Sequence, residues 1–212
     1  VFNSGPPNMA YHGAKVKSLA TSPLAIGVPS TQGPLLLDMA TSTIANGRLQ
    51  QAIRLGQQIP EGCALTKEGE PTTDPNKADI LLPLGGPKGS GISFMFEAIT
   101  GVLAANPLLA SMIGPGGKVQ HRHNAMVIVI NIAALRPLDE FKRDMDELGR
   151  VVKALPRLDP EVEISLPGER SAKQFAERSL KGIPLSPKIW ANMLELAEPV
   201  SYTHLRAHET SL

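Results

Sequence analysis

One segment, residues 81–91, constrains this chain more than any other, because it sets four glycines around a single lysine, Lys88. An apolar stretch, residues 92–105, follows it directly. Glycines let a backbone approach a ligand closely, and the bare N–H groups of such a loop can face an anion. A helix that starts here would add the positive end of its dipole to the charge of Lys88. The segment therefore predicts a turn into a buried helix, with a site for a phosphate or a carboxylate.

The spacing of this segment separates it from the two common phosphate-binding motifs. A P-loop needs Gly-Lys-Ser/Thr, whereas Pro87 precedes Lys88 and Gly89 follows it. The dinucleotide fingerprint G-x-G-x-x-G is also absent, since Gly86, Gly89 and Gly91 have the reverse spacing. A glycine-rich turn alone is more often only a turn, so a purely structural role stays open.

Further motifs accompany the glycine-rich segment along the chain. They occupy residues 3–10, 34–42, 45–48, 59–62, 69–75, 166–170 and 182–185. In this order and at these spacings, the chain resembles the malate/L-lactate dehydrogenase family of NAD(P)-dependent oxidoreductases. That family includes ureidoglycolate and sulfolactate dehydrogenases and is separate from the Rossmann-type lactate dehydrogenases. The resemblance covers residues 1–197, nearly the whole chain.

The resemblance implies an α/β fold, a mixed β-sheet with flanking helices, that is not a Rossmann fold. It also implies that residues 1–198 form the cofactor-binding core and that the family's N-terminal region is missing. That region carries the family's Ser-His-Gly motif and a second histidine assigned to acid/base chemistry. Residues 199–212 leave the family pattern and resemble translated sequencing adapter, so we expect a non-native tail; a natural polar tail is the alternative.

The residues that would bind the cofactor also follow from the resemblance. They are Ser4, Asp38, Met39, Ala40, Lys88, Gly89, Gly168, Glu169 and Arg170. Each has a simpler alternative: Asp38 as a capping or turn carboxylate, Lys88 as a solvated loop lysine, Arg170 as a surface arginine after a turn. Thr21 matches a substrate position, although Ala20 and Ser22 depart from the family's usual Gly-Thr-Asn-Pro.

The reaction implied by the family is hydride transfer between NAD or NADP and the carbon that bears a 2-hydroxyl or 2-oxo group. No catalytic residue is assigned here, because the acid/base histidine is expected upstream of Val1. We therefore expect the fragment to show no turnover, and we expect a homodimer at full length. Two alternatives stay open: reduction of cyclic imino acids, as in some family members, and a non-catalytic binding protein.

Composition narrows the remaining classes of function. The net charge is +1 and aromatic residues make up 4%, which argues against binding to nucleic acid. The longest apolar stretch is interrupted by Glu97 and by Asn106-Pro107, so no membrane span is expected. The single cysteine, Cys63, favours a reducing cytoplasm, and packing is favoured over a catalytic thiol. His121 and His123, with His12 as a distant third ligand, are interpreted as polar loop histidines, so no metal site is predicted.

Hydrophobic periodicity and turn residues predict the following elements. Strands are expected at 24–28, 35–37, 81–84, 125–132 and 162–166, the fourth of them buried on both faces. Helices are expected at 43–55, 92–105, 139–155, 171–180 and 187–197, with Ser42 or Thr43 capping the first and Gly56 ending it.

Overall fold

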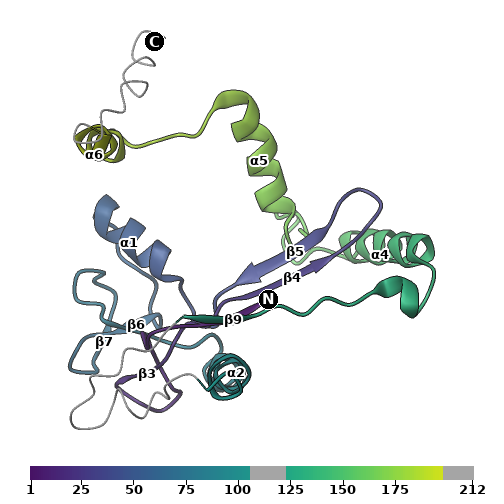
Figure 1. Ribbon diagram of the computed structural model, residues 1–212. Helices are drawn as coiled ribbons and strands as arrows, with labels where there is room; N and C mark the ends of the chain where they lie inside the picture. The colour runs from purple at the N-terminus through teal and green to yellow at the C-terminus, as the bar shows by residue number, and fades with distance from the viewer. Residues whose placement is uncertain (106–122, 198–212) are drawn as a thin grey trace. The chain divides into compact units, whose positions relative to one another are not determined.

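The computed structural model describes residues 1–105 and 123–197 (Figure 1). By its internal contacts the chain divides into two compact units, Val1–Gly168 and Glu169–Leu212. In the described residues the first unit holds two β-sheets and the helices beside them, and the second holds two helices. The predicted α/β class is confirmed. The predicted tail, 199–212, lies outside the described residues.

The first sheet has the strand order β5-β4-β1-β9. Its strands are β1 (Phe2–Ser4), β4 (Leu24–Val28), β5 (Leu35–Met39) and β9 (Asn124–Met126), and each pairs with its neighbour in the antiparallel sense. β4 and β5 form a hairpin that runs side by side in Figure 1, and Gly33 adopts a φ of 124° in its turn. The predicted strands at 24–28 and 35–37 are therefore confirmed.

The second sheet has the order β3-β2-β8-β6-β7. Its strands are β2 (Met9–Ala10), β3 (Lys17–Leu19), β6 (Ala64–Leu65), β7 (Pro71–Thr72) and β8 (Ile80–Leu81). The central pair, β2 with β8, is parallel. Helix α1 (Asn46–Leu55) packs Leu49 and Ala52 against this sheet. The resulting core contains Met9, Leu19, Leu49, Ala52, Ile59, Cys63, Ala64 and Leu81.

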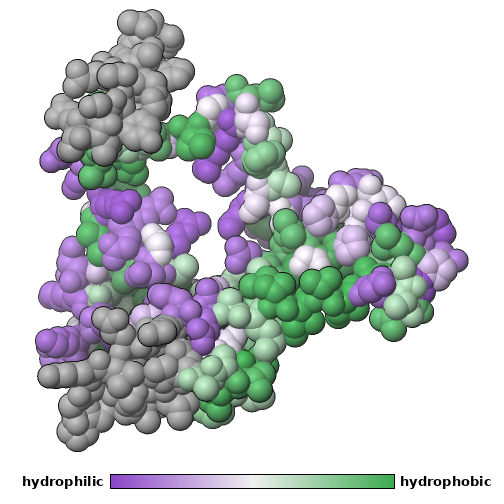
Figure 2. All heavy atoms as spheres, viewed as in Figure 1, coloured by the Kyte–Doolittle hydropathy of each residue, from purple (hydrophilic) through white to green (hydrophobic). Residues whose placement is uncertain are grey.

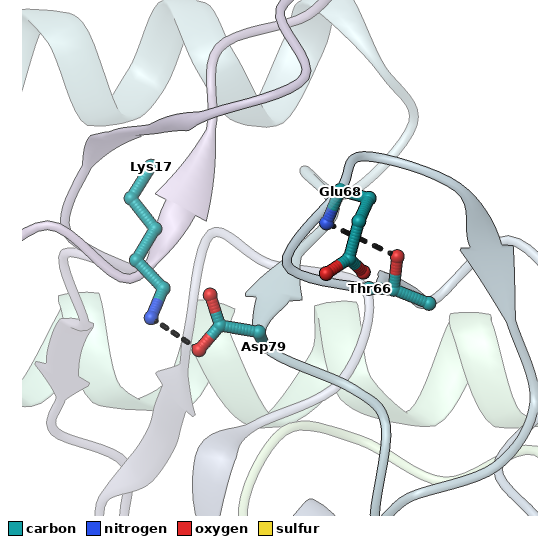
Figure 3. Close-up of polar contacts among 4 residues, drawn as sticks. All are labelled: Lys17, Thr66, Glu68 and Asp79. Carbon is teal, nitrogen blue, oxygen red and sulfur yellow. Dashed lines mark hydrogen bonds and ion pairs between the residues drawn. The ribbon is translucent and has the colours of Figure 1, made fainter.

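Polar contacts stabilise the periphery of the second sheet (Figure 3). The Lys17 ammonium donates to a carboxylate oxygen of Asp79 at 2.6 Å, which joins β3 to the residue before β8. Thr66 Oγ1 accepts from the backbone N–H of Glu68, in the turn between β6 and β7 where Gly69 has a φ of 87°. The ion pair between Lys17 and Asp79 thereby joins two segments of the sheet that are 62 residues apart in sequence.

We expect the Asp79→Asn variant to lose at most about 1 kcal/mol of unfolding free energy, because both side chains of its ion pair are well solvated. The exposed fractions are 38% for Lys17 and 41% for Asp79. Urea denaturation in low and high salt measures the loss, which should shrink as salt screens the pair. A loss of several kcal/mol would mean that Asp79 has a structural role beyond this pair.

The remaining helices of the first unit are α2 (Pro87–Glu97), the π-helical turn η1 (Ala98–Val102), the 3₁₀ turn η2 (Ile132–Ala134) and α4 (Leu138–Lys153). The second unit contains α5 (Glu169–Lys181) and α6 (Pro187–Ala197). The helices predicted at 139–155, 171–180 and 187–197 are confirmed. None of the helices in the described part of the chain combines the length and the apolar character that crossing a bilayer requires.

Two predicted helix starts are wrong. α1 begins at Asn46 rather than at residue 43, because Ser42 and Thr43 do not cap it. Their hydroxyls donate instead to the carbonyl oxygens of Ile44 and Pro83. α2 begins at Pro87, inside the glycine-rich segment, where proline suits a first helical turn. The predicted stop at Gly56 is confirmed by its φ of 63°.

The strand predictions fail in three places. Residues 162–166 form no strand, and β8 ends at Leu81 rather than at residue 84. In the predicted strand 125–132, only Ala125 and Met126 pair with a neighbour, as part of β9. The apolar run after Met126, from Val127 to Ile130, is 57–87% exposed, so its predicted burial on both faces is wrong. The reason is that β1, the neighbour of β9, begins at Phe2 and offers this run no partner.

Helix α4 is fastened to the β4–β5 turn through Thr31. The hydroxyl and the backbone N–H of Thr31 both donate to the carboxylate of Asp146. The hydroxyl hydrogen bond is the main cause that lowers the pKa of Asp146 below its ordinary value. Because the pKa is lowered in the folded state, this contact stabilises the fold above the ordinary pKa of aspartate and is lost as the pH falls through the folded value.

The Thr31→Val variant, which keeps the shape but removes the hydroxyl, should raise the pKa of Asp146 towards that of an ordinary aspartate. A titration of the Asp146 side chain by NMR, compared with Asp159 in the same spectra, measures the change. An unchanged Asp146 titration would show that the hydroxyl does not hold the carboxylate.

Candidate functional site

The glycine-rich segment forms a tight turn into α2. Gly85 and Gly86 adopt φ angles of 57° and 62°, which glycine reaches without steric cost. Four of the backbone N–H groups that were expected to face an anion instead bond within the turn and the first helical turn. The donor and acceptor pairs are Gly86 to Pro83, Lys88 to Gly85, Gly89 to Leu84 and Ser90 to Gly86. Anion recognition here therefore depends mainly on side chains and on the helix dipole.

Positive charge remains at the start of α2. The first turn of α2 contains no acidic residue, and no side chain caps it. Lys88 is exposed there, and none of the residues that the structure describes gives its ammonium a hydrogen bond or an ion pair. The positive helix end and the lysine therefore act at the same place, which favours an anionic group.

Gly89 packs directly on the backbone of two other segments. A Cβ at Gly89 would lie 2.4 Å from the carbonyl oxygen of Thr41 and 2.6 Å from the backbone nitrogen of Leu84. These two segments are themselves joined, since the N–H of Leu84 donates to the Thr41 carbonyl at 2.9 Å. The absence of a side chain at Gly89 is therefore a packing requirement, whatever else the residue contacts.

Thr41 connects this packing to the predicted substrate residue. Both the backbone N–H and the hydroxyl of Thr41 donate to the carbonyl oxygen of Thr21 at 2.8 Å. The backbone N–H of Thr21 donates in turn to the side-chain oxygen of Asn8 at 3.0 Å. The structure thus connects Thr21, which was predicted to contact the substrate, through Thr41 to Gly89, which was predicted to contact the cofactor.

His12 also lies at the start of α2. Its backbone N–H donates to Ser90 Oγ at 2.8 Å, and a Cβ built at Gly86 would lie 3.1 Å from its ring. The sequence had suggested His12 only as a distant third metal ligand beside His121 and His123. The structure places it next to Ser90, which lies 78 residues further along the chain. No group of three or more metal-binding side chains occurs in the described residues. His121 lies outside them, and the His123 ring lies against Gly5.

Ser4 ends β1 in the first sheet and has an unusual hydroxyl. The residue is 1% exposed, and no partner for its Oγ is found in the described structure. A buried hydroxyl without a hydrogen bond is unfavourable, so a ligand atom that reached it would supply the missing partner. This unpaired atom is compatible with the cofactor role that the resemblance gives to Ser4.

The other predicted cofactor residues divide between the two units. Asp38 and Met39 end β5 opposite Ala25 and Leu24, and Ala40 follows directly. Gly168, at a φ of 92°, approaches the same strand, since a Cβ there would lie 3.0 Å from the backbone nitrogen of Leu36. Glu169 and Arg170 begin α5 in the second unit, and their roles remain predictions.

Cys63 belongs to the hydrophobic core rather than to the site. It is 3% exposed among the core residues around α1 and β8, and burial raises the pKa of its thiol. The interpretation as a packing residue is confirmed, because a nucleophilic cysteine needs access and a lowered pKa.

We expect native Cys63 to react with iodoacetamide at least about 100-fold more slowly than the same thiol in urea, since only the opened, thiolate form reacts. Mass spectrometry of timed samples measures the rate. Rapid labelling of the native protein would contradict the buried position.

Comparison with known proteins identifies the family. The family model described as malate/L-lactate dehydrogenase matches residues 1–194. The chain is 33% identical over 198 residues to the malate/(S)-sulfolactate dehydrogenase of Methanothermus fervidus, covering 92% of this chain and 57% of that protein. It is 44% identical over 192 residues to the Delta(1)-pyrroline-2-carboxylate/Delta(1)-piperideine-2-carboxylate reductase of Pseudomonas putida, covering 87% and 54%.

Solved structures agree with the sequence comparison. The sulfolactate dehydrogenase of Methanocaldococcus jannaschii superposes with a TM-score of 0.77 at 31% identity, over 94% of this chain and 58% of that one. The chain thus spans somewhat more than half the length of the relatives it matches. With the motifs, the fold and these matches in agreement, the chain belongs to the malate/L-lactate dehydrogenase family.

Proposed function

We propose that this chain is the cofactor-binding part of an NAD(P)-dependent oxidoreductase that acts at the 2-carbon of a small hydroxy acid or oxo acid. The observation that carries the proposal is the convergence of Thr21, Thr41 and Gly89 beside Lys88 at the start of α2, in a chain of this family. When bound, a nicotinamide supplies or accepts the hydride. The residues of this chain bind and orient the reactants.

Three features of the described residues fit an anionic dinucleotide. The exposed ammonium of Lys88 and the positive end of α2 suit a phosphate group, and the buried Ser4 hydroxyl lacks a partner that a ligand could supply. The carboxylate of Asp38 at the end of β5 suits ribose hydroxyls, which donate hydrogen bonds. NAD and NADP both remain candidates.

A second candidate activity is the reduction of cyclic imino acids. The supporting observation is the 44% identity to the Pseudomonas putida reductase, against 33% to the Methanothermus fervidus dehydrogenase. A cyclic 2-imino acid carries its carboxylate next to a C=N bond, as a 2-oxo acid carries it next to C=O. One arrangement of cofactor and carboxylate-binding groups therefore serves both substrates.

Titration of the purified chain with NADH and NADPH, followed by nicotinamide fluorescence, tests cofactor binding. We expect saturable binding of at least one nucleotide and no turnover, because the family resemblance places the acid/base histidine outside these 212 residues. If neither nucleotide binds to the folded chain, the non-catalytic binding protein becomes the better interpretation.

Supplying the N-terminal region that the family resemblance implies, taken from the Pseudomonas putida reductase and joined to Val1, tests the reaction. We expect NAD(P)H oxidation with pyruvate, oxaloacetate or sulfopyruvate if the chain is a 2-oxo acid enzyme, and with Δ1-pyrroline-2-carboxylate if it is an imino acid reductase. The same fusion carrying Lys88→Met is the control for a dependence on this chain's own site.

We also propose that the complete protein is a homodimer that works in a reducing cytoplasm.

A further inference from the structure

An unpaired apolar run leaves β9 beside the start of the chain. Val127, Ile128, Val129 and Ile130 are 66%, 57%, 87% and 69% exposed. In Figure 1 the chain emerges from β9 next to the N-terminus and continues without secondary structure, and Figure 2 shows hydrophobic residues gathered over this part of the molecule. Four consecutive apolar residues held in water are costly, so this run needs a partner.

The strand register shows where that partner would lie. β1 pairs with β9 as Phe2 with Met126, Asn3 with Ala125, and Ser4 with Asn124. One further step in the same register places Val127 opposite Val1. Ile128 to Ile130 would then lie opposite the three residues that precede Val1 in a longer chain.

A strand opposite residues 128–130 would also lie beside β4 and could pair with it. The N–H and C=O of Ala25 bond to Val1 of β1, with the Val1 nitrogen donating at 2.7 Å. Because backbone groups alternate sides along a strand, the N–H and C=O of Gly27 point to that same edge, beyond the end of β1. Between Gly27 and Ile128 the sheet therefore has room for one strand that continues β1.

We propose that the gap between residues 26–28 of β4 and residues 127–130 is a strand site, filled in a longer form of this protein by the residues directly before Val1. The first residue before Val1 pairs with Ile128, the second bonds to Gly27, and the third pairs with Ile130. The relatives are nearly twice as long as their match to this chain, so they contain polypeptide to fill such a site. A second copy is a poorer occupant, because its strand would have to lie end to end with the Val1 ammonium.

The side-chain pattern of the missing strand follows from the same register. The first and third residues before Val1 share the face of Phe2, since side chains alternate along a strand. Phe2 packs against Phe96 of α2, with ring centroids 4.6 Å apart. Apolar residues are therefore expected at the first and third positions.

Extending the full chain by three residues tests the proposal. In one protein Val-Thr-Val is joined to Val1, and in the matched control Val-Pro-Val is joined instead. Proline has no N–H to donate to the carbonyl oxygen of Gly27, and it is excluded from central strands. Hydrogen exchange followed by NMR reads the Gly27 and Ile128 amides, and light scattering reads the mass. We expect the Val-Thr-Val form to exchange both amides at least about tenfold more slowly than the control, with both proteins folded.

Equal exchange of both amides in the two extended proteins would overturn the proposal. It would also be overturned if both amides were already protected from exchange in the unextended chain, and if this protection and the molecular mass both rose with protein concentration. That second result would assign the gap to another copy of the chain. Cofactor binding takes no part in this experiment, so its outcome is independent of the proposed activity.

Discussion

We expect the Gly89→Ala variant to lose about 3 kcal/mol or more of unfolding free energy. The added Cβ would lie 2.4 Å from the Thr41 carbonyl oxygen and 2.6 Å from the Leu84 nitrogen. Both are backbone atoms in segments joined by their own hydrogen bond, so neither can rotate away as a side chain would. Relief requires α2 to move off these segments. Thermal and urea denaturation of the purified variant measure the loss.

Gly91 provides the matched control, two residues further along the same helix. A Cβ built there meets no heavy atom within 4 Å. Because alanine is the better helix former, the Gly91→Ala variant should be stabilised by up to about 1 kcal/mol. If Gly89→Ala were as stable as the parent protein but bound nucleotide weakly, Gly89 would be a ligand contact rather than a packing residue.

The local part of the fold could be predicted from the sequence because its causes are local. The β4–β5 hairpin has apolar runs bounded by proline and glycine, and α4 repeats its apolar residues at helical spacing. Gly56 ends α1 through its own φ angle. In each case the residues that cause the structure lie within or beside the element, so the pattern alone indicates the outcome.

The wrong predictions concern structure that depends on residues far away in the sequence, which a local sequence pattern does not contain. The run after β9 is apolar enough for a central strand, but a central strand needs a neighbour on each side, and β1 begins too late to supply one. Free N–H groups were expected around Lys88, but a glycine's identity does not tell whether its N–H is already bonded. The place of His12 beside Gly86 arises from tertiary contacts, which chain spacing does not show.

Replacing Lys88 by methionine should weaken nucleotide binding about 10- to 100-fold, the effect of losing one charge-assisted hydrogen bond of about 1.5–3 kcal/mol. Methionine retains the length of the side chain but removes the charge. Titration of the variant with NADH and NADPH measures the dissociation constants, and the difference from the parent protein should shrink at high salt. Stability should change by less than about 0.5 kcal/mol, because the Lys88 side chain is exposed.

The Lys67→Met variant is the control for general charge, since Lys67 is an exposed lysine in the turn between β6 and β7. It should bind nucleotide as the parent protein does. The contrast matters because four backbone donors of the glycine-rich turn are already bonded, which leaves Lys88 and the dipole of α2 as the main groups there that attract an anion. If both variants bound NADH and NADPH like the parent protein, the start of α2 would not be the phosphate site, and the cofactor would have to be held through Ser4 and Asp38.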